Sequence, residues 1–408
     1  MPHTETTMPS CVIIVENLPV PLDRRVWQEA CALRDAGWTV SVICPKSEQY
    51  PKAFETIDDI EVFRHPLPLE ASGRFAFLLE YGAALFHEFR LLLKVARRRG
   101  FDVIQACNPP DLIFLVAAPF KLFGKRFVFD HHDVCPELFV AKFERRGFFH
   151  SLLLAAEKAT FKTANLVISA NETYRQLAIS RGGKKPEDVV TVYSVPDKSR
   201  IRRVPPNEAL RAGAGTVLGY IGIIADQDGV DHLVRCVHHL VADHGQTDVR
   251  AVVAGDGPAL ASVKALAVEL GVADRITFTG YLRGEELLAA LSTFDIGIIP
   301  DPVNEYNDKI SMNKVFEYSA LGIPSVSYNL TETKRLLGEA GCYAADATPA
   351  SLAAACLPLI TDLDLRKAAG ERASALAHAR FDWEREAQNY VAAYSRFLPD
   401  ISTVSKEA

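Results

Sequence analysis

Short apolar runs alternate with helical patterns along the whole chain, and this alternation limits the folds open to it. Residues within a run are nearly all apolar, which is typical of strands covered on both faces. Such strands with helices between them predict an α/β fold with doubly wound parallel sheets. The runs form a first series at residues 11–16, 39–44, 102–106, 126–130, 166–170 and 189–193, and a second series at residues 216–222, 249–255, 275–280, 296–300, 325–328 and 342–345.

The segments between the runs carry the spacing of amphipathic helices. In the first of them Val26, Ala30 and Leu33 fall on one helical face, and Gly37 follows where the helix should end. A last amphipathic helix is predicted at about 383–397, after the second series of strands is complete. No strand follows that helix, so packing back onto the first half of the chain is one use for it.

The length and the two series together predict two domains. At roughly 100–200 residues per domain, 408 residues of which 49% are hydrophobic suffice for two separate cores. The seam at 194–215 is rich in Pro, Gly and Arg and lacks a sustained period, as expected for a hinge. We therefore expect an N-terminal domain at 1–200, a C-terminal domain at 201–382 and a final helical segment at 383–408.

Composition disfavours several classes of protein. The formal net charge is −6, so the basic surplus usual in nucleic-acid-binding proteins is missing. The eight cysteines form no CxxC pair and lie mostly in apolar runs, which favours a reduced, cytoplasmic protein. The N-terminal residues lack the basic and apolar regions of a signal peptide, and no run of about 20 apolar residues predicts a membrane span.

A polar segment directly follows the predicted strand at 126–130. It holds His131, His132 and Asp133, and residues at the carboxyl end of a parallel strand are favoured for function over structure. A metal site is the alternative. We do not expect one, because no third ligand cluster occurs elsewhere and adjacent histidines point to different sides of the backbone.

Two arginines open the first predicted helix, again after a strand. Arg24 and Arg25 are either solvated loop residues or contacts for a phosphate or an acceptor, and a short motif alone does not decide between these. The glycines of the AGDGP segment at 254–258 are explained by a tight turn, so no nucleotide site is inferred from them.

The segment at 307–326 has features suited to a diphosphate. Ser311 is placed to cap a helix whose first turn holds Asn313 and Lys314. Helix N–H groups together with Lys309 and Lys314 would suit an anion, and Glu317 one turn on could accept both hydroxyls of a ribose. Ordinary surface charges on a helix are the other interpretation, and spacing alone leaves the two open.

Two apolar segments also carry clustered basic residues. The stretch at 73–100 ends in three arginines, and the stretch at 143–154 has the same character. Each alone is best interpreted as a core helix with a basic last turn. Together they suggest peripheral contact with an anionic membrane surface, at the inner face of the membrane.

The motifs in their order resemble the retaining glycosyltransferase family 4, which has the GT-B fold of two Rossmann-like domains facing a cleft. In the second half the resemblance lies in VVAGDGP and its continuation to IGIIP, and in NKVFEYSALGIPSV. The C-terminal FDWEREAQNYVAAY resembles the family's closing helix, which returns to the N-terminal domain. In the first half, NLPVPLDRRVW and HHDVCPELF are similar to members that make bacterial surface polysaccharides.

The resemblance implies a nucleotide-sugar donor, expected to be a UDP-sugar, held mainly by the second domain. It implies an acceptor, a glycan or a polyprenyl-linked lipid, held mainly by the first, with no metal or separate cofactor. Glu317 matches the family's ribose-binding glutamate, Gly222 the glycine that ends the first donor-domain strand, and His132, followed by Asp133, the histidine near the anomeric carbon. Retention by front-face attack would explain the lack of a glycosidase-type carboxylate pair.

The chain also departs from the family pattern. Lys309 stands where a first glutamate is usual, and Ile223 and Asp228 stand where an Arg and a Lys usually neutralise the diphosphate. Our hypothesis is that Lys309, Lys314, Arg24 or Arg25 compensates. Alternatives with the same fold are a sugar-nucleotide epimerase, an inverting transferase and a non-catalytic transferase-like subunit.

Overall fold

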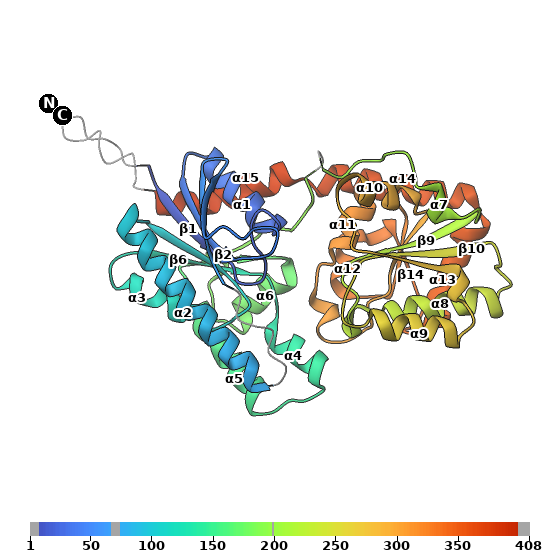
Figure 1. Ribbon diagram of the computed structural model, residues 1–408, viewed down its shortest axis with the longest axis horizontal. Helices are drawn as coiled ribbons and strands as arrows, with labels where there is room; N and C mark the ends of the chain where they lie inside the picture. The colour runs from blue at the N-terminus through green and yellow to red at the C-terminus, as the bar shows by residue number, and fades with distance from the viewer. Residues whose placement is uncertain (1–7, 67–73, 198–199, 399–408) are drawn as a thin grey trace. The chain divides into compact units, whose positions relative to one another are not determined.

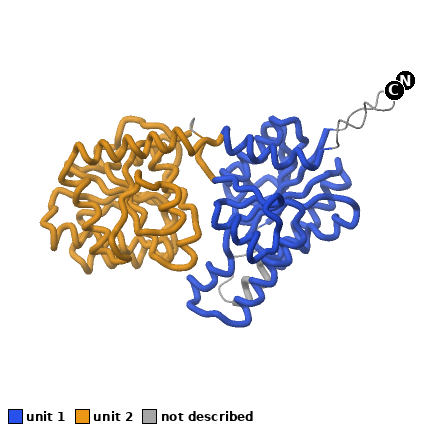
Figure 2. The backbone as a smooth tube through the Cα atoms, turned by 180° about the vertical axis from the view of Figure 1, so that it is seen from behind, with its two compact units in different colours: residues 1–193, 384–408 blue, residues 194–383 orange. Residues whose placement is uncertain are grey.

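The computed structural model describes residues 8–66, 74–197 and 200–398, with the side chains of 74–81 left aside. The chain divides into two compact units, Met1–Tyr193 with Glu384–Ala408, and Ser194–Trp383 (Figure 2). Each unit has its own sheet with helices on both faces (Figure 1). These are the two parallel α/β domains of the GT-B fold that the alternating runs and the resemblance predict.

The first unit holds a sheet of eight strands in the order β3-β4-β2-β1-β5-β6-β7-β8. All neighbouring strands run parallel except β3 and β4. The strands are β1 (Ser10–Ile14), β2 (Thr39–Pro45), β3 (Phe54–Ile57), β4 (Ile60–His65), β5 (Val103–Cys107), β6 (Arg126–His131), β7 (Leu166–Ser169) and β8 (Val189–Thr191). All six runs of the first predicted series are therefore confirmed as strands.

The hairpin of β3 and β4 is an element that the apolar runs did not predict. Its two-residue turn is Asp58-Asp59, with φ of 46° and 63° at the two positions. Aspartate is among the few non-glycine residues that tolerate this region of the backbone. Acidic residues interrupt the apolar pattern in both strands, which is why periodicity alone misses the hairpin.

The helices of the first unit are α1 (Arg24–Asp35), α2 (Arg74–Arg98), α3 (Phe114–Lys121), α4 (Cys135–Phe143), α5 (Phe148–Thr163), α6 (Glu172–Ser180) and α15 (Trp383–Tyr394), of which α15 begins at the last residue of the second unit. The predicted apolar face of α1 is buried at Val26, Ala30 and Leu33, and Asp23 caps the helix by accepting from the Val26 N–H. The predicted final helix is confirmed as α15.

The two faces of the first sheet differ in chemistry. Ile104, Phe127 and Phe129 join one large apolar cluster with residues of α2, α3 and α5. The intervening positions, Gln105 and Asp130, point to the other face, because successive side chains of a strand alternate. There they meet residues of α1 and α15. A buried polar layer thus lies under α1 and α15.

The second unit holds six parallel strands in the order β11-β10-β9-β12-β13-β14. They are β9 (Thr216–Ile221), β10 (Val249–Ala254), β11 (Ile276–Gly280), β12 (Ile296–Ile299), β13 (Ser325–Ser327) and β14 (Gly341–Tyr343). The helices are α7 (Glu208–Arg211), α8 (Val230–Ala242), α9 (Leu260–Glu269), α10 (Gly284–Thr293), α11 (Asn313–Ala320), α12 (Thr331–Leu337), α13 (Pro349–Thr361) and α14 (Leu363–Arg380). The second predicted series is confirmed strand by strand.

The loops after β9 and β10 pack backbone against backbone. A Cβ added to Gly255 would lie 1.8 Å from the carbonyl oxygen of Gly222, so no side chain fits there. The glycines of the AGDGP turn are therefore explained by close approach of two loops at the carboxyl edge of the sheet. In the described part of the chain, none of the helices is both long and apolar enough to cross a membrane.

Candidate active site

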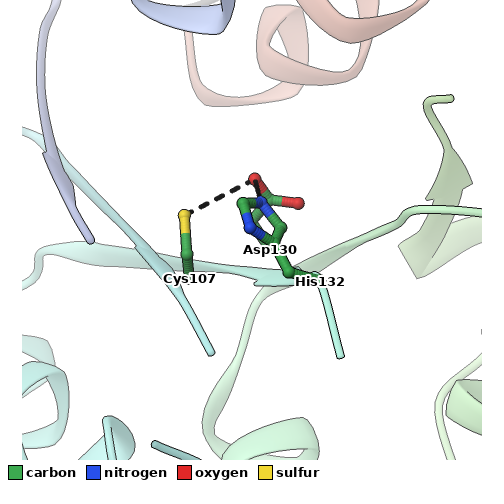
Figure 3. Close-up of side chains that lie close together, drawn as sticks. All are labelled: Cys107, Asp130 and His132. Atoms are coloured by element: carbon green, nitrogen blue, oxygen red, sulfur yellow. Dashed lines mark hydrogen bonds and ion pairs between the residues drawn. The ribbon is translucent and has the colours of Figure 1, made fainter. Parts of the chain in front are cut away.

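The side chains of Asp130 and His132 meet at the carboxyl end of β6. They are two positions apart in an extended segment, so they share a side, and His131 between them faces the other way. His132 Nε2 lies 2.6 Å from Asp130 Oδ2 (Figure 3). Asp130 is fully buried, whereas the His132 side chain is 17% exposed. A buried carboxylate thus holds the ring of a histidine that still reaches the surface of the unit.

Arg25 of α1 supplies a cation to this pair. Its Nη2 lies 2.9 Å from Asp130 Oδ1, and its Nη1 donates to the carbonyl oxygen of Val192 at 2.8 Å. Its Nε lies 3.1 Å from Glu29 Oε1, one helical turn further along α1. Arg25 is therefore not a solvated loop residue. It lies inside the unit and contacts two buried carboxylates.

Two groups hold the His132 ring through Nε2. Asp130 Oδ2 lies 2.6 Å from this nitrogen, and Arg25 Nε donates to it at 3.0 Å. The Glu29 oxygen near Arg25 Nε is a charge contact and accepts no hydrogen bond. Neither contact of the ring involves Nδ1, so Nδ1 is the ring nitrogen that can contact a ligand.

The charges in this cluster shift the pKa of each buried member. Burial disfavours the Arg25 cation, but Asp130 and Glu29 outweigh it and raise the Arg25 pKa. Burial also works against the Asp130 anion, yet Arg25 and His132 bring the Asp130 pKa far below its usual range. The Glu29 pKa is raised by burial and by the charge of Asp130. A proton shared by the two carboxyl groups therefore resides on Glu29, and Asp130 stays an anion.

Asn108, the residue after β5, fixes the backbone that follows β6. Its Oδ1 accepts from the N–H groups of His132 at 2.7 Å and Asp133 at 3.1 Å. Its Nδ2 donates to the Asp133 carbonyl at 2.6 Å and to Asp111 Oδ1 at 2.7 Å. Asn108 thus holds the backbone of Asp133, the residue predicted to act beside His132. The carboxylate that contacts the His132 ring is that of Asp130 and not that of Asp133.

The neighbouring His131 has a structural environment. Its ring is fully buried and packs against Phe129, Phe161 and Tyr174 at centroid distances of 5.4, 5.0 and 4.8 Å. Burial, with a further contribution from the charge of Arg181, lowers the His131 pKa to about 3. The ring is therefore neutral at physiological pH and is part of the core.

A metal ion fits poorly beside His132. Candidate ligand atoms of Cys107, Asp130 and His132 all lie within 4.8 Å of one another. However, the Arg25 guanidinium already contacts Asp130 and His132 from the same cluster and would repel a second cation. Burial also raises the pKa of the Cys107 thiol, whereas a metal binds the thiolate. The side chains of Asp130 and His132 therefore suit a guanidinium better than a metal ion, and Arg25 supplies that guanidinium.

In the second unit, the loop after β9 carries the predicted glycine and the two departures. Gly222 follows the last residue of β9, and its N–H donates to the Ala254 carbonyl of β10 at 3.1 Å. The Ile223 side chain is 66% exposed. Asp228 Oδ2 accepts from the Ala225 N–H at 3.1 Å, so this carboxylate closes a local turn.

Helix α11 holds the remaining predicted residues. It begins at Asn313, and its N-cap is Met312, without a side-chain cap. The prediction that Ser311 caps the helix is therefore wrong, because the helix starts one residue too late for its hydroxyl to reach. Asn313 is exposed at the first turn, and Glu317 is half-buried one turn further on. The backbone N–H groups of the first turn are thus not engaged by a capping side chain.

The two lysines of this region have different environments. Lys314 is buried, and its Nζ lies 3.1 Å from Asp301 Oδ2 and 4.9 Å from the ring centre of Tyr220. Burial works against the Lys314 cation, but Asp301 outweighs it and raises the Lys314 pKa. Lys309 ends a short 3₁₀ turn at 307–309 and is partly exposed, with its Nζ donating to the Glu305 carbonyl at 2.8 Å. Lys309 is the cation nearer to solvent.

Sequence reasoning singled out His132 but did not predict the residues that contact its ring. Arg25 contacts the His132 ring, whereas Arg24, the first residue of α1, is half-buried. Asp130, Glu29 and Asn108 were not predicted. A signal existed for Asp130, because it lies two residues before His132 in an extended run. No local pattern marks Glu29 or Asn108, which the fold brings in from other elements.

Two Rossmann-like units, one of which holds a histidine against a buried carboxylate after a strand, match the GT-B fold. A family model described as "Glycosyl transferase 4-like domain" matches residues 22–194, and one described as "Glycosyl transferases group 1" matches residues 215–362. The two matches together span most of the chain, and the chain belongs to the GT4-type glycosyltransferases.

Relatives and solved structures agree with this assignment. A 2-deoxystreptamine glucosyltransferase of Streptomyces kanamyceticus is 28% identical over 280 residues, covering 66% of this chain and 70% of that protein. A sucrose-phosphate synthase from Thermosynechococcus elongatus has a TM-score of 0.77 at 17% identity, covering 95% and 98% of the two chains. The Anabaena protein Alr3699/HepE, solved with UDP and glucose, has a TM-score of 0.72 at 16% identity, covering 95% and 100%.

Proposed function

We propose that the chain transfers a sugar, with retention of configuration, from a UDP-sugar to a glycan or polyprenyl-linked acceptor in bacterial surface polysaccharide synthesis. Membership of the GT4-type glycosyltransferases supports the transfer reaction. Alr3699/HepE, which shares the fold, was solved with UDP and glucose, and this supports UDP as the nucleotide. The observation that carries the proposal is the His132 ring held by the buried anion of Asp130.

In the proposed reaction, His132 serves the transferred sugar. Departure of the diphosphate leaves the anomeric carbon and ring oxygen with partial positive charge. A ring held at Nε2 by Asp130 directs Nδ1 away from that carboxylate, toward whatever binds at the carboxyl end of β6. There it can form a hydrogen bond with a sugar hydroxyl while the Asp130 anion favours the developing cation. His132 would therefore position the sugar and stabilise its developing positive charge.

The diphosphate would be bound at the start of α11. The uncapped N–H groups of its first turn suit an anion, since the N-terminal end of a helix carries partial positive charge. Lys309 adds a partly exposed cation, and Glu317, half-buried one turn along α11, would accept from the ribose hydroxyls. Lys314 contributes less charge than a solvated lysine, because Asp301 already neutralises it.

Release of UDP from a panel of UDP-, GDP- and ADP-sugars, with and without acceptor, tests the proposal. We expect turnover of a UDP-sugar and a roughly 10²- to 10⁴-fold lower rate in His132→Ala. His239→Ala is the matched control, because His239 lies on α8 of the second unit, where its Nδ1 pairs with Asp243. Wild-type rates in His132→Ala, or turnover confined to a GDP-sugar, would contradict the assignment.

The stereochemistry has its own assay. Nuclear magnetic resonance of the product, recorded before any change at the anomeric centre, gives the configuration of the new bond. Transfer from an α-linked donor should yield an α-linked product. A β-linked product would instead support the inverting alternative, and a changed sugar with no acceptor consumed would support the epimerase.

The Streptomyces kanamyceticus relative is named for transfer to 2-deoxystreptamine, so a small polar acceptor is a second candidate. Parallel assays with a polyprenyl diphosphate-linked sugar and with 2-deoxystreptamine separate the two. Product formation only with the lipid-linked sugar supports the polysaccharide role, and product formation only with the aminocyclitol overturns it.

An exposed surface between α4 and α5 suits the membrane contact that a lipid-linked acceptor requires. Phe143, Phe148, Phe149 and Leu152 are exposed there, with Lys142 and Arg145 exposed beside them. Apolar rings flanked by cations fit the interface of an anionic bilayer. The basic end of α2 is less suited, because Arg98 and Arg99 pair with Glu61.

Sedimentation with vesicles tests this membrane contact. Vesicles of phosphatidylglycerol and phosphatidylcholine should bind the wild type but bind Phe148→Ser/Phe149→Ser several-fold less. Val268→Ser is the matched control, because Val268 is an exposed apolar residue on α9 of the second unit. Equal binding by all three proteins would remove the α4–α5 surface from the proposal.

A further inference from the structure

Two buried tyrosines of α15 hold the amide of Gln105. Tyr390 and Tyr394 are fully buried, one turn apart, and both hydroxyls donate to Gln105 Oε1, the first at 2.6 Å. Gln105 lies on β5, on the face of the sheet that α1 and α15 cover. Because the Asp130 anion on the other side of the amide only accepts, the nitrogen faces that carboxylate and the oxygen faces the two hydroxyls.

The amide nitrogen of Gln105 then faces the two carboxyl groups of the active-site cluster. Its Nε2 donates to Glu29 Oε2 at 2.7 Å and to Asp130 Oδ2 at 3.1 Å. Asp130 Oδ2 is the same atom that contacts His132 Nε2 at 2.6 Å. A hydrogen-bonded chain therefore runs from the tyrosines of α15 through Gln105 and Asp130 to His132, entirely within the first unit.

The chain of contacts matters because an amide can be turned over. Without the tyrosine hydroxyls, the buried Gln105 Oε1 loses both donors of α15, and only the contacts of Nε2 with Glu29 and Asp130 still favour the present orientation of the amide. A reversed amide would place that oxygen against two carboxyl groups, of which Asp130 is anionic. Asp130 would lose a donor and gain a repulsive neighbour, and its hold on His132 would loosen.

We propose that α15 positions His132 through this relay, with Tyr390, Tyr394 and Gln105 as positioning residues. The inference rests on the proposed role of His132 in transfer. It adds that the C-terminal helix does more than pack on the sheet, since it fixes the carboxylate that orients the active-site ring. Helix α15 follows α14 of the second unit after two residues, so one continuous segment of chain leads from that unit to the relay.

The test is the double variant Tyr390→Phe/Tyr394→Phe, which keeps both rings and removes both hydroxyls. We expect kcat to fall about tenfold with little change in KM for the donor, since two net hydrogen bonds are lost from the support of a group acting on the sugar. The acidic limb of the pH–rate profile should move to higher pH, because weaker donation from Gln105 to the Asp130 anion raises the lowered pKa of Asp130. A merely structural role for the hydroxyls would not move that limb.

Two controls make the outcome specific. Tyr328→Phe removes a buried hydroxyl that contacts His232 in the second unit, and its pH profile should stay that of the wild type. In a His132→Ala background, the double substitution should cause no further loss, because the relay acts through that ring. Unchanged kcat and pH profile in the double variant, or an equal further loss without His132, would overturn the relay.

These results also separate the relay from the proposed function. If His132→Ala keeps full activity, the proposed role of His132 fails and the relay fails with it. If His132→Ala is inactive while the double variant behaves as wild type, the relay alone fails. Loss in both, with the shifted pH profile and no additivity, supports both.

Discussion

Replacing Arg25 with methionine removes the cation from a cluster that holds two buried carboxyl groups. Arg25 contacts Asp130 at 2.9 Å and Glu29 at 3.1 Å, and both carboxyl groups are fully buried. Removing one partner of a buried ion pair costs about 3–5 kcal/mol, because the other charge stays desolvated and unpaired. We expect the first unit to lose about this much stability at pH 7, and its melting temperature to fall by roughly 10 °C.

The loss should depend on pH in a defined direction. In the wild type the Asp130 pKa is lowered, so its contribution to stability is present above the unfolded-state pKa and disappears as the pH falls toward the folded-state value. In Arg25→Met, burial without a cation raises the folded-state pKa of Asp130, so folding is penalised as the pH rises. The difference between the two proteins should therefore widen from pH 4 to pH 7.

Urea unfolding followed by tryptophan fluorescence measures this difference. Trp27 and Trp38 are buried in the first unit, so most of the signal reports on that unit. Arg34→Met is the control on the same helix, since Arg34 pairs with Asp35, which is 66% exposed, and such surface pairs contribute less than about 1 kcal/mol. A loss in Arg25→Met no larger than in Arg34→Met, or one independent of pH, would refute the reasoning.

Three predictions concern the second unit. Glu317→Gln should weaken UDP binding roughly tenfold in calorimetric titration without lowering the melting temperature, because a neutral amide accepts ribose hydroxyls less well. Lys309→Ala should weaken UDP binding several-fold at unchanged stability, whereas Lys314→Ala should destabilise the unit by about 3 kcal/mol in urea, since Asp301 is left buried and unpaired. Gly255→Ala should lower both the melting temperature and UDP affinity, because its Cβ would lie 1.8 Å from a carbonyl oxygen of the β9 loop.

The strands could be predicted because a strand buried on both faces of the sheet has a continuous run of apolar residues. A run such as 11–15 is apolar throughout, since helices cover the sheet above and below. The β3–β4 hairpin at the sheet edge has no such run, because β3 is partly exposed and its residues alternate between exposed and half-buried positions. The turn at Asp58-Asp59 was the signal available, and it is shorter than the runs that periodicity detects.

The candidate site was predictable only where its residues are neighbours in sequence. His132 could be found because it follows a strand directly, and Asp130 could have been found from its spacing of two. The pairing of Gln105 with Tyr390 could not, because 285 positions separate the two residues and each looks like an ordinary buried side chain in its own element. At Ser311 the local pattern predicted a helix cap that the structure does not form, because α11 begins after Met312.

The departures from the family pattern all concern the cations near the start of α11. Ile223 and Asp228 bring no cation to the loop after β9, and Asp228 closes a turn of its own. Lys314 is neutralised by Asp301, so under the proposed function the uncapped start of α11 and Lys309 are the groups expected to bind the diphosphate. Helix N–H groups bind an anion by direction as well as by charge, and they lose no side-chain entropy in doing so. A chain that relies on them needs the start of α11 to remain uncapped, which gives a physical reason for Ser311 to be left out of the helix end.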